Sequence, residues 1–241
     1  MPERVSECLI CRRMDYKESS RLVFGYTPTG RQSYLAQGAN KLTSPLRVAT
    51  ETLTKVRITH AGKGMQIIRD IEVLDDYPEI KPDLERYTAC LHLLELTLHV
   101  SEGDLDHAKL YRFLDKILDR LKTNEHHLVY IMVFESKLLH LLGLQPAFNH
   151  CHACPATDNL VFSIKEGGMC CPNHAPQGKV LTAETVDDWR HLHYFDLASG
   201  SPKAFSATEL RALRLALDDY YQYHLGWESH ARKLLRGLLG Y

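Results

Sequence analysis

The sequence predicts an α+β protein of several domains, with a five-stranded β-barrel at its N-terminal end and a mostly α-helical region after it. Two changes of pattern support this prediction. Short runs with β-strand composition, separated by turn residues, occupy residues 1–76. Beyond residue 82, leucines recur at helical spacing, and residues 148–179 interrupt that spacing with glycine, proline, cysteine and histidine.

The composition is that of a folded globular protein. Of the 241 residues, 44% are hydrophobic and 24% are charged, which excludes collagen-like, coiled-coil and wholly disordered chains. The longest apolar run, residues 126–144, contains Glu135 and Lys137, so we expect no membrane span. The first residues lack the basic and then apolar pattern of a secretion signal, and we therefore expect a cytoplasmic protein.

Five strands are expected in the N-terminal region. Pro28 and Gly30 mark a turn after the second strand, because proline presets φ and glycine tolerates positive φ. Residues 48–58 alternate in the way that a half-buried strand does. Five short strands fit a small closed barrel, and the OB-fold is the commonest five-stranded type. The expected strands are 5–14, 21–26, 31–37, 48–58 and 65–74.

Helices are expected from residue 84 onward. Leu91 and Leu94 illustrate the helical spacing of the first, and Gly143 is a natural C-cap for the third. Ser206 and Glu209 form the pattern of a capping box before a later helix. The expected helices are 84–100, 105–121, 128–142, 182–193, one that begins at 206, and 229–239. The expected domains are an OB-fold at 1–80, a helical part at 81–147, a cysteine-rich segment at 148–179 and a second helical part at 180–241.

Charge is distributed unevenly along the chain. Residues 1–69 hold 12 Lys and Arg against 5 Asp and Glu, a net charge of +7, whereas residues 70–241 carry −8. A basic barrel predicts a polyanionic partner, and OB barrels bind single strands through cations and stacked aromatic rings. A single tyrosine is more often packed in a core and a single cation more often solvated, so only the cluster is evidence. The candidate DNA-binding residues are Arg12, Arg13, Lys17, Arg21, Arg31, Lys41, Arg47, Lys55 and Arg57, with Tyr16 and Tyr34 as candidate stacking rings.

A Cys-x2-Cys pair and a Cys-x2-His pair predict a metal site within residues 148–179. The pairs are Cys151 with Cys154 and Cys171 with His174. Each pair places two ligands on one turn of backbone, and the intervening segment can complete a tetrahedron around zinc. Four protein ligands leave no open coordination position, so we predict one structural zinc ion per chain, in a zinc finger. The alternative is that these cysteines are unliganded thiols.

Other cysteines and histidines are weaker candidates. Cys170 could compete as a ligand, although its position breaks the two-residue spacing of the second pair, and His150 and His152 lie nearby. Cys8 and Cys11 form another Cys-x2-Cys pair, but residues three apart in a strand face opposite sides and no second pair matches them. No phosphate-binding loop, nucleophile elbow or His-Glu-x-x-His motif occurs in the sequence, and nothing in it requires an enzyme.

Several short motifs occur in a fixed order along nearly the whole chain. They are DYKESSR at 15–21, TPTGR at 27–31, GANK at 38–41 and FESKLLHLLGLQP at 134–146. The last of these leads into the first cysteine pair, and Gly167 and Gly168 precede the second. This series resembles the bacterial RecO family of recombination mediators and DNA repair proteins. His174 stands where many relatives have a fourth cysteine, and both residue types ligate zinc.

The resemblance implies an N-terminal OB-fold and a helical domain that carries a zinc finger. It also implies a non-enzymatic function: binding of single- and double-stranded DNA, annealing of complementary strands in a RecF-type pathway, and, with RecR, loading of RecA onto DNA coated by single-stranded-DNA-binding protein. The residues alone leave an alternative, a zinc-containing OB-fold protein that binds RNA or another protein. A zinc hydrolase or deaminase is disfavoured because the ligand set is closed.

The resemblance further implies contact with the acidic, apolar-ended C-terminal tail of single-stranded-DNA-binding protein. Such a tail needs an apolar pocket with cations beside it. Two groups of residues on expected helices could supply one, and the sequence does not choose between them. They are Arg232, Lys233 and Arg236 beside Leu234, Leu235 and Leu238, and Lys109, Arg112 and Lys116.

Overall fold

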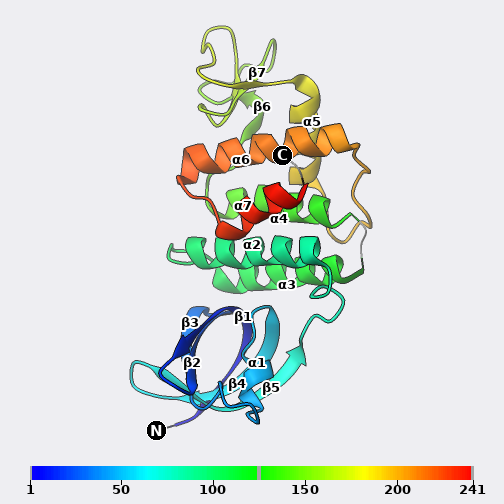
Figure 1. Cartoon of the computed structure of the whole chain (residues 1–241). Helices are drawn as coiled ribbons and strands as arrows, with labels where there is room; N and C mark the ends of the chain where they lie inside the picture. Colours follow the sequence, from blue (N-terminus) through cyan, green and yellow to red (C-terminus); the bar gives the residue numbers. More distant parts are fainter. Residues whose placement is uncertain (1, 124–125, 240–241) are drawn as a thin grey trace. The chain divides into compact units, whose positions relative to one another are not determined.

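The structure is a computed structural model that describes residues 2–123 and 126–239 (Figure 1). These residues form two compact units. The first comprises residues 2–123 together with 229–239, and the second comprises residues 126–228. The last helix therefore belongs to the same unit as the barrel. The domain limits expected from the sequence, 1–80, 81–147, 148–179 and 180–241, stay a proposal.

Five strands of the first unit close into a barrel in the order β1-β2-β3-β5-β4 (Figure 1). β3 and β5 pair in parallel, whereas the other neighbouring strands pair antiparallel. This is the five-stranded barrel of an OB-fold, and it confirms the predicted fold class. The elements are β1 (Arg4–Tyr16), β2 (Ser20–Thr27), β3 (Gly30–Ala36), the short helix α1 (Leu46–Ala49), β4 (Thr54–Ala61) and β5 (Gln66–Asp75).

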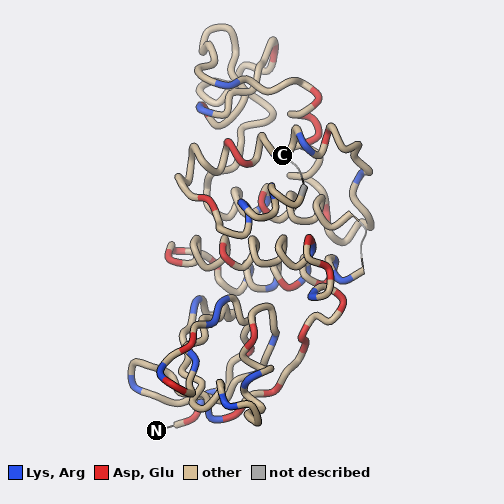
Figure 2. Tube along the Cα trace, viewed as in Figure 1, with Lys and Arg blue, Asp and Glu red and all other residues tan. Residues whose placement is uncertain are grey.

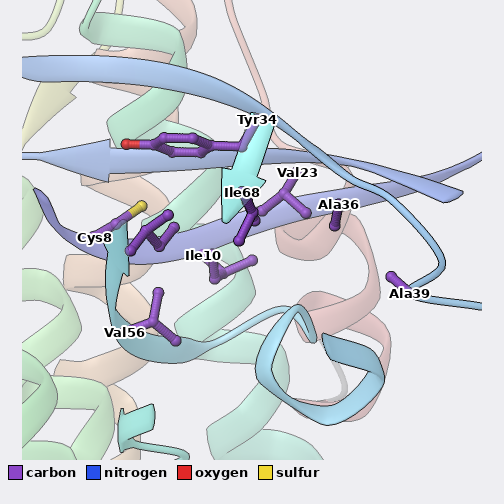
Figure 3. Packing of buried hydrophobic residues seen from close by; sticks show 9 residues of the cluster. Cys8, Ile10, Val23, Tyr34, Ala36, Ala39, Val56 and Ile68 are labelled. Atoms are coloured by element: carbon purple, nitrogen blue, oxygen red, sulfur yellow. The ribbon is translucent and has the colours of Figure 1, made fainter. Parts of the chain in front are cut away.

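The barrel is filled by side chains that alternate along its strands. Figure 3 shows Cys8 and Ile10 of β1 meeting Val23 and Val56 from other strands. All four are fully buried, because every second residue of a strand points to the same face. Tyr34 belongs to the same core and is 0% exposed, so this ring packs the barrel instead of facing solvent.

The predicted strand over residues 48–58 is wrong in its first half, which forms part of α1 and a bend before β4 begins. The buried guanidinium of Arg21 donates hydrogen bonds to the carbonyl of Arg47 and the hydroxyl of Thr50, and these bonds hold the segment in a turn. Leu53 then has a φ of 57°, which a regular strand cannot adopt. The apparent alternation of side chains therefore did not reflect a continuous strand.

Three helices complete the first unit: α2 (Leu84–Val100), α3 (His107–Thr123) and α7 (His230–Leu239). Their bounds agree with the predicted helices to within two residues. Helix α3 is fixed to the barrel by polar contacts. The hydroxyl of Tyr111 donates to Glu7 at 3.1 Å, and the ammonium of Lys55 lies 2.9 Å from Asp115. A hydrogen bond and an ion pair therefore join the barrel to α3.

The second unit contains helices α4 (His127–Leu141), α5 (Ala183–Tyr194) and α6 (Ala207–Leu225) and a small four-stranded sheet. The predicted capping box is present, since Ser206 and Glu209 each bond to the other's backbone N–H at the start of α6. The indole of Trp189 is buried and donates to the hydroxyl of Ser136 at 3.0 Å. The strands are β6 (Ala147–Cys151), β7 (Val161–Ser163), β8 (Gly168–Cys170) and β9 (Val180–Leu181), in the order β6-β8-β7-β9.

No helix within residues 2–123 and 126–239 is both long enough and apolar enough to cross a membrane.

The close approach of β1 and β2 makes the barrel sensitive to one added methyl group. A Cβ on Gly25 would lie 2.0 Å from the Sγ of Cys8. We expect Gly25→Ala to lower the free energy of unfolding by about 1–3 kcal/mol, the usual cost of overpacking a core. Chemical denaturation monitored by circular dichroism measures this change.

Two further variants make the test specific. Gly103→Ala is the matched control, because the nearest atom to its added Cβ is 3.6 Å away. Combining Gly25→Ala with Cys8→Ala removes the colliding sulfur and should recover part of the lost stability. An unchanged denaturation midpoint for Gly25→Ala alone would contradict the packing of the barrel core.

Candidate metal centre and nucleic-acid interface

Two ligand-bearing turns follow neighbouring strands of the small sheet in the second unit. β6 ends at Cys151, and Cys171 comes directly after β8. The two strands pair in parallel, so their carboxyl ends meet at the same edge of the sheet. The backbone N–H of His152 donates to the carbonyl of Met169 at 2.7 Å and ties the first turn to β8. Parallel pairing is therefore what brings the two sequence motifs together.

The four ligand atoms have the spacing of a tetrahedral metal site. Cys154 Sγ lies 3.7 Å from Cys171 Sγ, and His174 Nδ1 lies 3.4 Å from Cys171 Sγ and 3.5 Å from Cys151 Sγ. A tetrahedral ion with bonds of about 2.3 Å to sulfur and 2.0 Å to nitrogen separates its ligand atoms by roughly 3.5–3.8 Å. All four atoms lie within 4.8 Å of one another. The cluster could therefore hold a metal ion.

The pKa values of two cysteines in the cluster are shifted in the direction that favours metal binding. Burial alone would raise the pKa of the Cys151 thiol, but hydrogen bonds from the backbone at Ala153 and Cys171 and from neighbouring thiols lower it to about 6. Burial likewise opposes a low pKa at Cys171, yet its hydrogen bonds, the first with His174, lower that pKa below the usual value. Thiolate is the form of cysteine that ligates a metal. Two of the three sulfurs are thus shifted toward the ligating form.

The metal cluster rests on a packed base. A Cβ on Gly168 would lie 2.7–2.9 Å from atoms of Ala147, so only glycine allows β6 and β8 to approach this closely. Phe148 and Phe162 stack below the sheet with ring centroids 5.8 Å apart, and both contact the ring of Trp189. The aromatic contacts therefore anchor the segment to α5.

The weaker metal candidates lie outside this cluster. Cys170 is fully buried, and its Sγ points to a backbone carbonyl of its own strand at 3.8 Å. His150 contacts the carbonyl of its neighbour, and His152 lies 3.8 Å from a glutamate. Cys8 and Cys11 are buried in the barrel, where burial raises the pKa of both thiols. In the described part of the chain, the four predicted ligands form the one group of three or more such residues with converging ligand atoms.

The structure corrects part of the proposed set of DNA-binding residues. Tyr34 is in the barrel core and cannot stack on a base. Arg21 is 5% exposed, and its guanidinium is occupied by the side chains of Asn40 and Glu51 and by the backbone of the α1 segment. Lys55 is bound between Glu7 and Asp115. These three side chains therefore have structural roles.

Three more of the predicted cations are paired with carboxylates on the surface. Arg13 contacts Glu51 at 2.8 Å and Arg31 contacts Glu102 at 2.7 Å. Arg57 pairs with Glu72 on the adjacent strand. Figure 2 shows Lys and Arg along the barrel with Asp and Glu among them.

The remaining predicted residues lie toward one end of the barrel. Arg12, Tyr16, Lys17 and Lys41 are exposed, and Arg47 is half-buried. Within the described ranges, no ion pair is formed by the four cations of this group, which are Arg12, Lys17, Lys41 and Arg47. Tyr16 ends β1 and Lys17 begins the turn to β2, where the ammonium lies 5.4 Å from the ring centroid. The structure thus keeps five of the eleven candidates as an accessible group.

Strands β1, β2 and β3 present a partly apolar outer face, which we call the β1–β3 face. After a bulge in β1, its side chains fall in rows with those of β2 and β3. Its members are Arg12, Met14, Tyr16, Leu22, Phe24, Ser33 and Leu35, all exposed or half-buried. The Cζ of Arg12 lies 5.7 Å from the ring centroid of Phe24. The face therefore combines aromatic and cationic groups.

Sequence reasoning missed Phe24. Its neighbour Val23 is buried in the barrel, so the two side chains lie on opposite faces of β2. The alternation of β2 shows that one of the two faces outward, but the register with β1 and β3 is needed to decide which. The pairing of Phe24 with Arg12 supplies that register.

An OB-fold barrel with an accessible aromatic and cationic face, joined to helices and a Cys3His cluster, defines a class of multidomain OB-fold proteins. Comparison with known proteins places the chain within this class. The model for Recombination protein O N terminal matches residues 1–77, and the model for Recombination protein O C terminal matches residues 81–233. The chain belongs to the RecO family, as its motifs indicated.

Individual relatives agree with this assignment. The chain is 27% identical over 231 residues to the DNA repair protein RecO of Exiguobacterium sp., covering 94% of this chain and 93% of that protein. It is also 27% identical over 238 residues to the DNA repair protein RecO of Bacillus cereus, covering 96% of each. Membership of the family supports a role in DNA repair and recombination.

The metal cluster predicts a contrast between two adjacent cysteines. Cys171→Ser should reduce the bound divalent metal from one ion per chain to well below one, because it removes a converging ligand. Cys170→Ser is the matched control and should keep the metal, because that sulfur points away from the cluster. Elemental analysis after dialysis measures the stoichiometry, and the thiolate absorption of cobalt-loaded protein checks the ligand set. Equal metal content in both variants would contradict this assignment.

Proposed function

We propose that this chain is a DNA-binding recombination mediator that acts without bond chemistry. In this proposal it anneals complementary strands and, with RecR, helps to load RecA onto single-stranded DNA coated by single-stranded-DNA-binding protein. The observation that carries the proposal is membership of the RecO family over nearly the full chain. Annealing requires neutralised phosphates and accessible bases, and a barrel with a cationic and aromatic surface is suited to supply both.

The β1–β3 face is the proposed site of DNA binding. This face and the loops beside it are where OB-folds bind oligonucleotides. Phe24 and Tyr16 are placed to stack on bases, while Arg12 and Lys17 lie beside those rings and can contact phosphates. Lys41 and Arg47 would extend the contact beyond the strands. Paired cations such as Arg57 are expected to contribute less, since a carboxylate already balances their charge.

We propose zinc as the metal of the Cys3His cluster. Thiolate and imidazole ligands in a closed tetrahedron are typical of structural zinc. The strands around the cluster are two to five residues long, too short to form a stable core of their own. Zinc would therefore stabilise the fold of this segment and would act on DNA only indirectly.

Helix α7 is the better of the two proposed sites for the tail of single-stranded-DNA-binding protein. Leu234 and Leu238 are exposed there, beside the exposed Lys233. Helix α3 offers the exposed cations Lys109 and Arg112 but has no large hydrophobic side chain exposed along its described length. An acidic tail with an apolar end would find both kinds of contact on α7. The contact with RecR stays a proposal without an assigned surface.

The charge of the β1–β3 face predicts a change in salt dependence. Replacing Arg12 and Lys17 together by alanine should weaken binding to single-stranded DNA of any sequence. It should also make the plot of log K against log salt less steep by roughly 1.4, at about 0.7 for each lost phosphate contact. Fluorescence anisotropy of a labelled oligonucleotide across a salt series measures both. Arg57→Ala is the control, and an equal effect in that variant would contradict the location of the site.

The aromatic part of the face predicts a separate effect on annealing. Phe24→Leu keeps an apolar side chain but removes the ring, and it should weaken binding roughly tenfold, within the range of one stacked base. It should also slow the annealing of complementary oligonucleotides, followed by fluorescence quenching. Tyr34→Phe should anneal at the wild-type rate, since that ring is buried. Wild-type annealing by Phe24→Leu would exclude stacking at this position.

A further inference from the structure

Leu42 is the most exposed large hydrophobic side chain in the described parts of the chain, with 86% of its surface accessible. It lies in the loop of residues 37–45 between β3 and α1, which we call the β3–α1 loop. Because its apolar surface stays in water when the protein folds, this side chain contributes almost no hydrophobic stabilisation. Neither the metal cluster nor the β1–β3 face uses this residue.

The β3–α1 loop is held in place from below. Ala39 is fully buried and belongs to the core of the barrel (Figure 3). The Nε of Arg21 donates to the side-chain oxygen of Asn40 at 2.6 Å. Backbone hydrogen bonds from Lys41 to Gly38 and from Ser44 to Lys41 fold the rest of the loop into successive turns. Leu42 therefore projects from a fixed base, and its exposure is a built feature of the loop.

The same loop is joined to the turn between β1 and β2. The backbone N–H of Asn40 donates to the carbonyl of Ser19 at 2.9 Å, and its side-chain amide donates to the carbonyl of Ser20 at 3.3 Å. That turn carries Lys17 and directly follows Tyr16, both of which belong to the candidate DNA-binding group. The apolar tip at Leu42 is thus fixed to one edge of the β1–β3 face.

The charges near Leu42 favour a polyanionic partner. Lys41 precedes it and is exposed, and Lys17 lies on the attached turn. Of the acids on this end of the barrel, Glu51 and Asp15 both contact Arg13 and Arg21. Glu18 alone does not offset the exposed cations of the group. An apolar side chain that projects between cations is the arrangement by which proteins insert a wedge between base steps while holding the phosphates on either side.

We propose that Leu42 inserts between adjacent bases of DNA bound to the β1–β3 face and unstacks them. The inference rests on the proposed function, because it requires DNA on that face. Unstacked bases would be presented to an incoming complementary strand, which links the wedge to annealing. Arg21 and Asn40 act as positioning residues that hold the loop and do not themselves touch the bases.

The test uses the full chain and a single-stranded oligonucleotide that contains 2-aminopurine, whose fluorescence rises when it is unstacked. At saturating protein, wild-type should raise this fluorescence, and Leu42→Ala should lose at least half of the rise while its Kd changes less than about threefold. Leu42→Met keeps an apolar side chain of similar volume and should retain the rise. Leu84→Ala is the control, since Leu84 is also exposed, at 64%, but lies at the start of α2.

The outcomes separate this inference from the proposed function. If wild-type protein does not change the anisotropy of the oligonucleotide, the protein does not bind DNA. Both the proposed function and the insertion of Leu42 are then contradicted. If wild-type binds but Leu42→Ala gives the full rise in fluorescence, the wedge is overturned and DNA binding stands. If Leu42→Ala changes the sedimentation of the protein without changing the fluorescence, Leu42 belongs to a protein contact, which also overturns the proposal.

Discussion

The buried guanidinium of Arg21 is the interaction on which the basic end of the barrel depends. A charge removed from water is tolerated only when partners surround it, and Arg21 has the side chains of Asn40, Thr50 and Glu51 and the carbonyl of Arg47. These partners come from the β3–α1 loop, from α1 and from the segment before β4. One side chain thus turns residues 46–53 away from a strand and fixes the loop that carries Lys41 and Leu42.

The small sheet of the second unit is also held in place by a few specific contacts, but these are aromatic contacts and a ligand cluster. The sheet has few residues to bury, so local order must come from the aromatic base and from the ligand cluster. Parallel pairing of β6 and β8 sets the ligand pairs side by side, and Gly168 permits the close approach that the pairing requires. Hydrogen bonds already lower the pKa values of the Cys151 and Cys171 thiols, which favours their thiolate forms. The backbone therefore prepares the site before any ion binds.

Features encoded over short stretches of sequence could be predicted, and features that depend on distant contacts could not. The helix at 84–100, the capping box at Ser206 and the spacing within each ligand pair depend on residues that are close together in the sequence. The roles of Arg21 and Tyr34 depend on residues elsewhere in the barrel. The pairing of Phe24 with Arg12 depends on a bulge in β1 and on strand register, which alternation alone does not specify.

The same distinction changes the meaning of the basic N-terminal region. A net charge of +7 over residues 1–69 suggests a broad cationic trough. In the folded unit, however, acids from beyond residue 69 neutralise part of that charge: Glu72 pairs with Arg57, Glu102 with Arg31, and Asp115 with Lys55. Of the candidate DNA-binding cations, those that remain accessible and without a carboxylate partner in the described ranges lie beside aromatic and apolar side chains. In the proposed binding of a single strand, stacking of bases on the rings of this face would add to the phosphate contacts of these cations.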